Sequence, residues 1–250
     1  MSLPFGRFLN NLTTLESQHF QMLLTDYKSF RVCSLDQDVT VGKGLTVRRL
    51  GLQDYEPIWR AMQYIAAHPK AERGNEIWLL SHKPVFTLGQ AAKLEHILDR
   101  GDIPLIQSDR GGQVTYHGPG QLVIYILLDV RERVMGIRKL VELIEESIVE
   151  TLSGFGIIAK SRSGAPGVYV NDAKIAALGL RIKNGRSYHG LSLNVDMDLS
   201  PFDRINPCGY PGLVVTQLVD LVKDKGGLMQ KASNSLLNTL LRQLHYQELS

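Results

Sequence analysis

The stretch KIAALGLRIKNGRSYHGLSLNV, residues 174–195, decides the fold because it contains two strands and the turn between them. Residues 174–183 form a largely apolar strand pattern, and residues 186–195 supply the returning strand. The Asn-Gly pair at 184–185 is typical of a two-residue hairpin turn, whose central residues need positive φ. The stretch therefore predicts a long antiparallel hairpin.

Further strands extend this hairpin on both sides. PGVYV (166–170) precedes it through Asn171-Asp172. QLVIYILLD (121–129) is a continuous apolar run, as expected of a strand that is buried on both faces. Shorter runs predict strands at 45–51, 76–81, 84–89 and 104–109.

Three segments have apolar residues at helical spacing. One begins near Tyr55 and ends before His68-Pro69, a second ends at Gly154, and a third runs through Leu236 to Leu244. Strands and helices together predict an α/β fold: a single domain with a mixed β-sheet and surrounding helices. We place this domain at residues 45–250 and interpret residues 1–44, which have a weak helical pattern, as an N-terminal appendage.

Composition excludes several classes of function. The 250 residues carry a formal net charge of +3, and the basic residues are dispersed, so we expect no nucleic-acid partner. No apolar run approaches the roughly 20 residues that span a bilayer, and the N-terminus lacks a signal-peptide pattern, so we expect no membrane partner. Two cysteines in the whole chain are consistent with a cytoplasmic location.

One of these cysteines, Cys208, lies in RINPCGYPG (204–212) between a proline and a glycine. It has three interpretations: a small buried apolar side chain, a disulfide partner of Cys33, or a nucleophile held at a fixed angle by a rigid turn. The low cysteine content disfavours the disulfide. The turn alone does not decide between the other two.

A second unusual stretch is DRGGQVTYHGPGQ (109–121), in which four glycines and a proline interrupt two strands. Its glycines would let the backbone approach a ligand. The stretch lacks the Gly-Lys-Ser/Thr ending of a phosphate loop and the spacing of a dinucleotide loop. His117 has no partner at zinc-ligand spacing, so we expect a hydrogen-bonded structural histidine and no metal site.

Lys174 begins an apolar strand. The ordinary interpretation is a solvated charge at the end of the strand. The alternative is a lysine beside an apolar surface, where burial would lower its pKa and make it an acid or base. His189-Gly190 similarly interrupts the returning strand where a ligand could approach.

Taken together, RGGQVTYHGPGQ, GAPGVYV, KIAALGLRI, YHGLSLNVDMDLSPFDRINPCGY and the upstream HKPVFTLGQ closely resemble the lipoyl(octanoyl) transferase family, the octanoyl-[acyl-carrier-protein]:protein N-octanoyltransferases. The resemblance covers roughly residues 45–220. It implies the catalytic-domain fold of biotin and lipoate protein ligases.

The resemblance also implies a reaction and its partners. The donor would be an octanoyl thioester on the phosphopantetheine of acyl carrier protein, and no separate cofactor would be needed. The acceptors would be lysine ε-amines on lipoyl domains of 2-oxo-acid dehydrogenase E2 subunits and on the glycine cleavage H protein. A cysteine thioester intermediate would carry the octanoyl group between them, in the first step of endogenous protein lipoylation.

The family's functional residues transfer onto matching positions of this sequence. The catalytic nucleophile corresponds to Cys208 and its paired lysine to Lys174. The substrate pocket corresponds to three segments: Arg110, Gly111, Gly112, Gln113, Val114, Thr115, Tyr116 and His117; Ala177, Leu178 and Gly179; and Gly190, Leu191 and Ser192.

Three rival functions remain at this point. A lipoate-activating ligase would resemble Arg-Arg-x-x-Gly-Gly-Gly, whereas Gln113 follows Gly112 here. A cysteine hydrolase would pair Cys208 with His189 or His117. A catalytically silent module would only bind acyl carrier protein.

Overall fold

The structure is a computed structural model that describes residues 39–41, 44–68, 74–131 and 136–246. The weak helical pattern around residues 15–30 and Cys33 both lie outside these described residues. The predicted hairpin is confirmed: β10 (Ala173–Lys183) pairs antiparallel with β11 (Arg186–Asn194). Asn184 and Gly185 have φ of 51° and 78°, as this turn requires.

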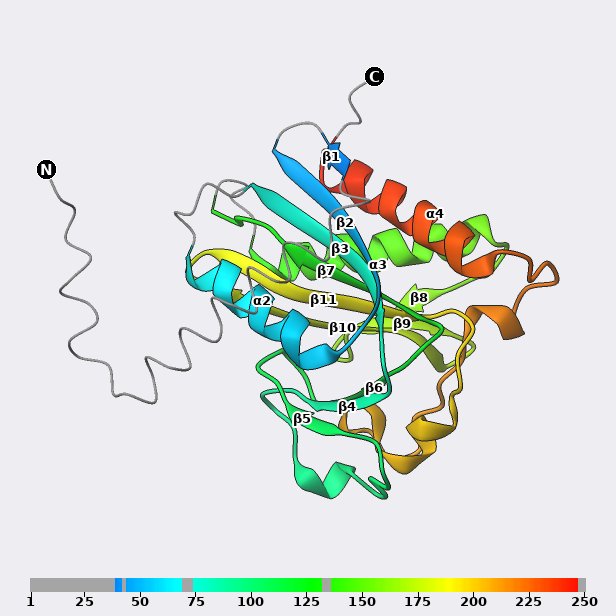
Figure 1. Ribbon diagram of the computed structural model, residues 1–250. Coiled ribbons are helices and arrows are strands. Elements are labelled where there is room, and N and C mark those ends of the chain that lie inside the picture. The colour runs from blue at the N-terminus through cyan, green and yellow to red at the C-terminus, as the bar shows by residue number, and fades with distance from the viewer. Residues whose placement is uncertain (1–38, 42–43, 69–73, 132–135, 247–250) are drawn as a thin grey trace, which may run out of the picture.

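The hairpin lies within a mixed, mainly antiparallel sheet (Figure 1). The strand order is β1-β2-β3-β7-β11-β10-β9-β8, and the β2–β3 pair is parallel because α2 (Tyr55–Ala67) crosses between them. The other strands of this sheet are β1 (Val39–Val41), β2 (Leu45–Gln53), β3 (Asn75–His82), β7 (Gln121–Leu127), β8 (Lys160–Ser161) and β9 (Gly167–Val170).

Strand β1 precedes the predicted domain boundary at residues 44 and 45. It pairs antiparallel with β2 through Val39↔Val47 and Val41↔Leu45. The main sheet therefore starts inside the segment that we interpreted as an appendage, and the boundary itself stays a prediction.

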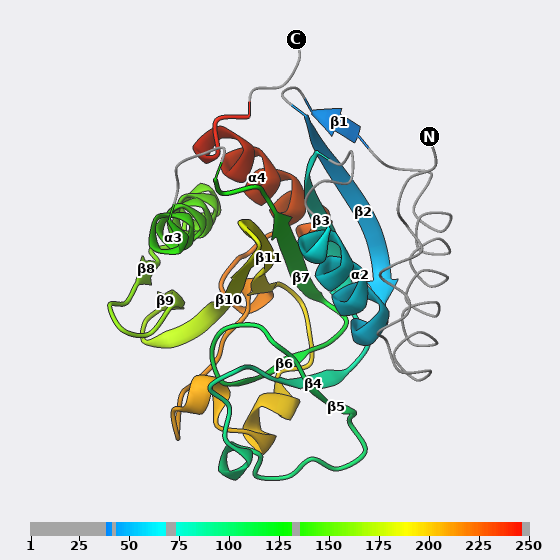
Figure 2. The ribbon, with the colours of Figure 1, turned by 90° about the vertical axis from the view of Figure 1, so that its left-hand side faces the viewer.

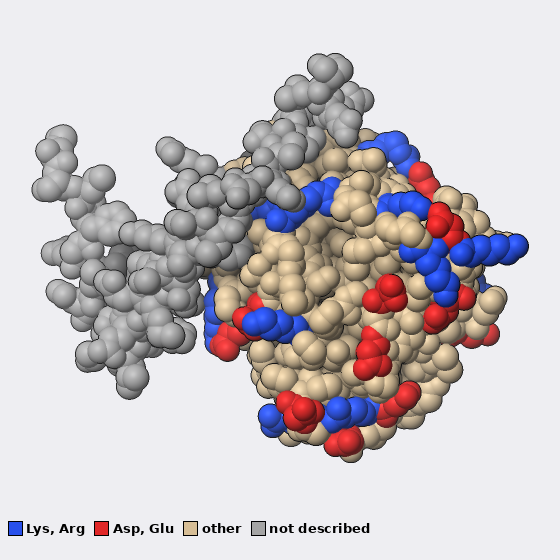
Figure 3. All heavy atoms as spheres, turned by 45° about the vertical axis from the view of Figure 1, so that its right-hand side comes forward, with Lys and Arg blue, Asp and Glu red and all other residues tan. Residues whose placement is uncertain are grey.

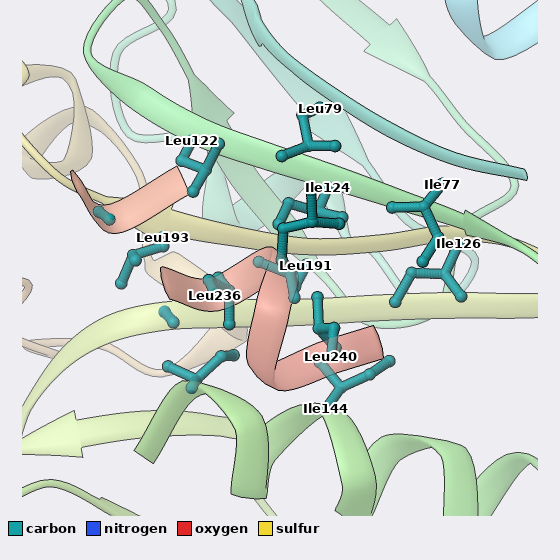
Figure 4. Packing of buried hydrophobic residues seen from close by; sticks show 14 of the residues in the cluster. Ile77, Leu79, Leu122, Ile124, Ile126, Ile144, Leu191, Leu193, Leu236 and Leu240 are labelled. Atoms are coloured by element: carbon teal, nitrogen blue, oxygen red, sulfur yellow. The ribbon is translucent and has the colours of Figure 1, made fainter. Parts of the chain in front are cut away.

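Two helices cover one face of the large sheet and α2 covers the other (Figure 2). α3 (Ile137–Gly154) and α4 (Leu228–Gln243) pack their apolar stripes on the strands. Figure 4 shows Ile144 of α3 and Leu236 and Leu240 of α4 directed at side chains from β3, β7 and β11. The predicted fold class, with its mixed sheet and surrounding helices, is confirmed.

A second, three-stranded sheet was not predicted from the sequence. Its strands are β4 (Val85–Leu88), β5 (Leu105–Gln107) and β6 (Val114–His117), in the order β5-β4-β6. It lies below the large sheet in Figures 1 and 2, beside the 3-10 turns η4 (Ser200–Arg204) and η5 (Pro207–Gly209). The strand β6 falls inside the stretch that the glycines marked as a loop. Its four residues are the only ones between Gly112-Gln113 and Gly118.

Acidic and basic side chains are mixed on the face shown in Figure 3, in keeping with the dispersed basic residues of the sequence. Among the described residues, no helix has the length and apolar character needed to cross a membrane.

Candidate active site

A cavity of about 370 Å³ lies over the β7, β11 and β10 strands. The glycine-rich segment 109–113, called the RGG loop below, covers one side of it, and the turn around Cys208 closes another. The fourteen predicted substrate-pocket residues and the two predicted catalytic residues can therefore be checked against the lining of this one cavity.

Most predicted site residues line this cavity. They are Arg110, Gly111, Gly112, Gln113, Val114, Thr115, His117, Lys174, Ala177, Leu178, Gly179, Gly190, Leu191, Ser192 and Cys208. Tyr116 does not line it: its ring packs against Phe86 and Phe202 in an apolar cluster between β6 and η4. Side chains alternate along β6, so Tyr116 points to the opposite face from Thr115 and His117, which line the cavity.

His189, where a ligand approach was expected, lines the cavity as well. Several other lining residues were not expected from the sequence: Tyr55, Val123, Tyr125, Ile137, Val141, Gly164, Ala165, Pro166, Leu180 and Tyr210. Residues 164–166 belong to the GAPGVYV motif, so the resemblance contained a signal for them. Ile137 and Val141 come from α3, whose apolar stripe indicated only a core-facing helix.

Cys208 is at the centre of η5 and has a left-handed φ of 57°. Pro207 is buried, and the Gly209 amide donates to the Asn206 carbonyl at 2.9 Å. Non-glycine residues rarely adopt positive φ, and such conformations concentrate at functional sites. The turn therefore holds the thiol in one orientation while leaving it partly accessible.

Lys174 lies opposite this thiol and is 4% exposed. Its backbone is fixed at the start of β10, where its amide donates to the Val214 carbonyl at 2.9 Å. Its Nζ donates to Cys208 Sγ at 3.1 Å and to the Pro166 carbonyl at 3.0 Å, and it lies 5.0 Å from the centre of the Tyr169 ring. The two predicted catalytic residues are thus in direct contact.

The pKa of Lys174 corrects one expectation. Burial acts to lower this pKa, as expected from the sequence, but the electrostatic interaction with Cys208 and the hydrogen bonds with Cys208 and Tyr169 act in the opposite direction. The net result is a raised pKa. Lys174 is therefore positively charged beside the Cys208 sulfur.

The carbonyl that accepts from Lys174 belongs to a segment that α3 holds in place. Glu145 of α3 accepts a hydrogen bond from the Gly167 amide at 2.8 Å. Gly167 has φ of +137°, and a Cβ there would lie 2.7 Å from the Ala176 carbonyl oxygen and 3.1 Å from Lys174 Nζ. Only glycine leaves room for the ammonium at this position.

The RGG loop is held by its own side chains. The guanidinium of Arg110 is buried and donates to Thr87 Oγ1 at 3.0 Å and to the Thr87 carbonyl at 2.6 Å. Gly112 has φ of +83°, so the loop needs glycine there for conformation as well as for close approach. A side chain at Gly112 would strain the backbone and is no clean probe of substrate contact.

Asp109 links this loop to α2 and β11. Its carboxylate accepts hydrogen bonds from His189 Nε2 at 2.9 Å, Tyr188 OH at 2.5 Å, Trp59 Nε1 at 2.7 Å and Gln63 Nε2 at 3.1 Å. Burial alone would raise its pKa, but these hydrogen bonds outweigh it and hold the pKa far below its usual range.

Neither His189 nor His117 is hydrogen-bonded to Cys208. His189 donates to Asp109, and His117 Nδ1 donates to Gln121 Oε1 at 2.7 Å, as expected of a structural histidine. Burial lowers the pKa of both rings, that of His117 to about 3, so both are neutral. Because Cys208 Sγ contacts Lys174 instead, this geometry disfavours the Cys/His hydrolase. Among the described residues, no three His, Cys, Asp or Glu side chains group as metal ligands would.

Comparison with known proteins identifies the family. Residues 54–240 match the lipoyl protein ligase A/B catalytic domain. The chain belongs to this family. Among its relatives, an octanoyltransferase of Hahella chejuensis is 63% identical over 180 residues, which are 72% of this chain and 80% of that protein. An octanoyltransferase of Stutzerimonas stutzeri is 58% identical over 200 residues, 80% of this chain and 90% of the relative.

Solved structures of this family share the fold. A putative lipoate protein ligase from Thermoplasma acidophilum with bound lipoic acid superposes with a TM-score of 0.63 at 16% identity, covering 80% of this chain and 86% of that one. At such low identity the likeness concerns the fold. The activity is assigned from the relatives of high identity, which are octanoyltransferases. This member of the lipoyl protein ligase A/B family is therefore an octanoyltransferase, and the predicted acyltransferase function is confirmed.

Proposed function

We propose that the chain takes an octanoyl group from acyl carrier protein and transfers it, through a thioester on Cys208, to lysine ε-amines of lipoyl domains on 2-oxo-acid dehydrogenase E2 subunits and the glycine cleavage H protein. The contact between Lys174 Nζ and Cys208 Sγ at 3.1 Å supports this proposal most directly. It supplies a thiolate nucleophile and an acid in one place, beside a cavity of the size that small-molecule sites have.

In the first half-reaction, the Cys208 thiolate attacks the thioester carbonyl. A new C–S bond forms to Cys208 and the C–S bond to the pantetheine thiol breaks. Lys174, which starts as an ammonium, gives its proton to the departing thiolate. The products are octanoyl-Cys208, a free thiol on the donor and a neutral Lys174.

Acylation then prepares Lys174 for the second half-reaction. The interactions that raise its pKa come largely from the ionised thiol, and they disappear once Cys208 is acylated, whereas burial remains and lowers the pKa. The neutral amine can therefore accept the proton of the attacking lysine of the acceptor. The amide bond forms, the Cys208 thiolate leaves, and the ion pair is restored.

This cycle needs neither ATP nor a metal, because a thioester is already activated towards an amine. A reducing compartment such as the cytoplasm fits the requirement for a free Cys208. The lipoate-activating ligase is the rival function within the same fold, and it would require ATP.

Mass spectrometry of the intact protein tests the proposal. Incubation with octanoyl-acyl carrier protein should add one hydroxylamine-labile octanoyl group to the wild type and none to Cys208→Ser. Adding a lipoyl domain should discharge the group onto the acceptor, and EDTA and apyrase should have no effect. An adduct that forms only with ATP would establish the ligase instead.

A further inference from the structure

The outer edge of β10 beside the cavity is open. β11 pairs with β10 as far as Lys183↔Arg186, but β9 pairs with it only as far as Gly167↔Ala177. Beyond Ala177, no strand of the described part of the chain pairs with β10 on that side. Edge strands of this kind present unpaired N–H and C=O groups.

The direction of these groups follows from two close approaches. The Ala176 carbonyl oxygen faces Gly167 across the β9 side, 2.7 Å from where a Gly167 Cβ would be. Four residues later, the carbonyl oxygen and nitrogen of Leu180 face the RGG loop, 3.0 and 3.9 Å from where a Gly111 Cβ would be.

Because backbone groups alternate sides along a strand, Leu178 presents its N–H and C=O to this same outer side. Leu178 is half-buried and lines the cavity. Within the described residues, its backbone forms no hydrogen bond outside the sheet.

This open peptide lies next to the reacting atoms. Lys174 Nζ is 3.1 Å from the position of a Gly167 Cβ, and Gly167 is paired with Ala177. Leu178 is the next residue, about 3.3 Å further along the strand. Leu178, Lys174 and Cys208 also line one cavity, so a substrate group bonded to Leu178 would share that cavity with the reacting thioester.

The unpaired N–H and C=O of an edge strand favour a ligand that contains an amide group. An extended strand edge binds another amide, donating from its N–H and accepting with its C=O. In a pantetheine thioester, a secondary amide follows the sulfur after two methylene groups. We infer that the N–H and C=O of Leu178 pair with an amide of the donor's pantetheine arm, which adds to β10 as a short pseudo-strand. This inference rests on the proposed function, since it takes a pantetheine thioester as the donor.

Three small thioesters test the inference on the wild-type enzyme. S-octanoyl-N-acetylcysteamine keeps the amide, S-octanoyl-2-mercaptoethyl acetate replaces its N–H with oxygen, and S-octanoyl-pentanethiol has methylene groups only. The rate of Cys208 acylation is measured for each by intact mass. We expect kcat/KM to fall about tenfold for each hydrogen bond that is lost. Equal rates for the amide and the pentanethiol compound would overturn the inference.

Leu178→Pro then removes the proposed donor. Proline is tolerated at an edge strand where the N–H faces away from the sheet, so the variant should fold. Leu178→Ala is the matched control, because it loses the side chain and keeps the N–H. In Leu178→Pro the preference for the acetate over the pentanethiol compound should vanish, whereas Leu178→Ala should retain it.

Other outcomes separate the inference from its alternatives. If Leu178→Pro slows all three thioesters equally, the N–H serves the reacting carbonyl and the pantetheine assignment is wrong. If it slows only discharge to the lipoyl domain, the edge binds the acceptor, which also overturns the assignment. If no thioester acylates wild-type Cys208, the proposed function itself fails. If Leu178→Pro does not fold, the three thioesters on the wild type still decide.

Discussion

At the scale of single residues, the proposed chemistry depends on the contact between Lys174 Nζ and Cys208 Sγ at 3.1 Å. Lys174 is buried, yet its pKa is raised, because its interactions with Cys208 and Tyr169 outweigh the effect of burial. The left-handed turn fixes the other half of the pair. Cys208 and Lys174, the proposed nucleophile and acid, are therefore positioned by backbone geometry on two separate segments.

Replacing the ammonium tests this pair. Lys174→Met keeps most of the side-chain volume and removes the charge, so less Cys208 should be thiolate at pH 7. Iodoacetamide alkylation at pH 7 should slow about tenfold or more, and its pH profile should move to higher pH. Lys183→Met, an exposed position on the same strand, is the control. Identical profiles for Lys174→Met and the wild type would show that the two residues are not coupled.

At the scale of elements, α3 contributes to the site although none of its residues reacts. Its Glu145 holds the Gly167 amide, and the neighbouring Pro166 carbonyl accepts from Lys174. Helix and active site are thereby joined through two hydrogen bonds. Glu145 is a positioning residue, since it acts on Lys174 through the segment between them.

Removing this hydrogen bond should loosen Lys174. We expect Glu145→Ala to lower kcat for octanoyl transfer about tenfold, with a smaller change in KM, and to broaden the pH profile of Cys208 alkylation. Glu145→Gln keeps an acceptor oxygen and should recover most of the activity. Glu146→Ala, exposed on the same helix, is the control. A loss of thermal stability with an unchanged pH profile would indicate a purely structural role.

Asp109 holds the RGG loop in place through hydrogen bonds from side chains of α2 and β11. Its folded-state pKa is lowered, so its contribution to stability is complete above the unfolded pKa near 4 and is lost as pH falls from there towards the folded pKa. Asp109→Asn should reduce the free energy of unfolding by about 3 kcal/mol at pH 7.

The pH dependence of Asp109→Asn provides the check. Its stability deficit relative to the wild type should shrink as pH falls below about 4, because Asp109 of the unfolded wild type then takes up a proton while the folded carboxylate stays ionised, and asparagine has no such group. Urea unfolding at pH 7 and pH 3 measures this difference. Asp203→Asn, at an exposed aspartate, should show no such deficit. A deficit that stays constant with pH would mean that the lost contacts are not those of the carboxylate charge.

At the scale of the whole molecule, the catalytic unit is the two-sheet body with its three covering helices. We expect residues 1–37 to be dispensable, because every motif of the site lies beyond them. A protein starting at residue 38 keeps β1 and should transfer octanoyl at the wild-type rate. A protein starting at Gly44, which loses β1, should also remain active but unfold at a lower temperature.

Thermal unfolding and octanoyl transfer of the two truncated proteins and the full chain distinguish these cases. Loss of activity in the protein starting at residue 38 would show that the N-terminal segment contributes to the site. Equal melting temperatures for both truncated proteins would show that β1 adds no stability.

The sequence by itself determined most elements of the large sheet and its helices, and its family motifs proposed Cys208 and Lys174 as the reacting residues. Hairpin, buried strand and helices follow from local patterns: turn residues that permit positive φ, continuous apolar runs, and apolar stripes at helical spacing. The family motifs located Cys208 and Lys174 because residues that do chemistry stand in long, specific stretches. These signals are local along the chain, so they can be recognised from the sequence without a structure.

Tertiary structure decided how distant segments meet. Lys174 and Cys208 are 34 positions apart, and only the folded sheet brings Nζ within 3.1 Å of Sγ. The same contact reverses the direction in which burial alone would shift the Lys174 pKa. Tyr116, predicted in the pocket, points away from it because side chains alternate along β6. Ile137, Val141 and Pro166, which were not predicted, line the pocket from other segments. Proximity and electrostatics depend on distances through space, and sequence spacing does not specify those distances.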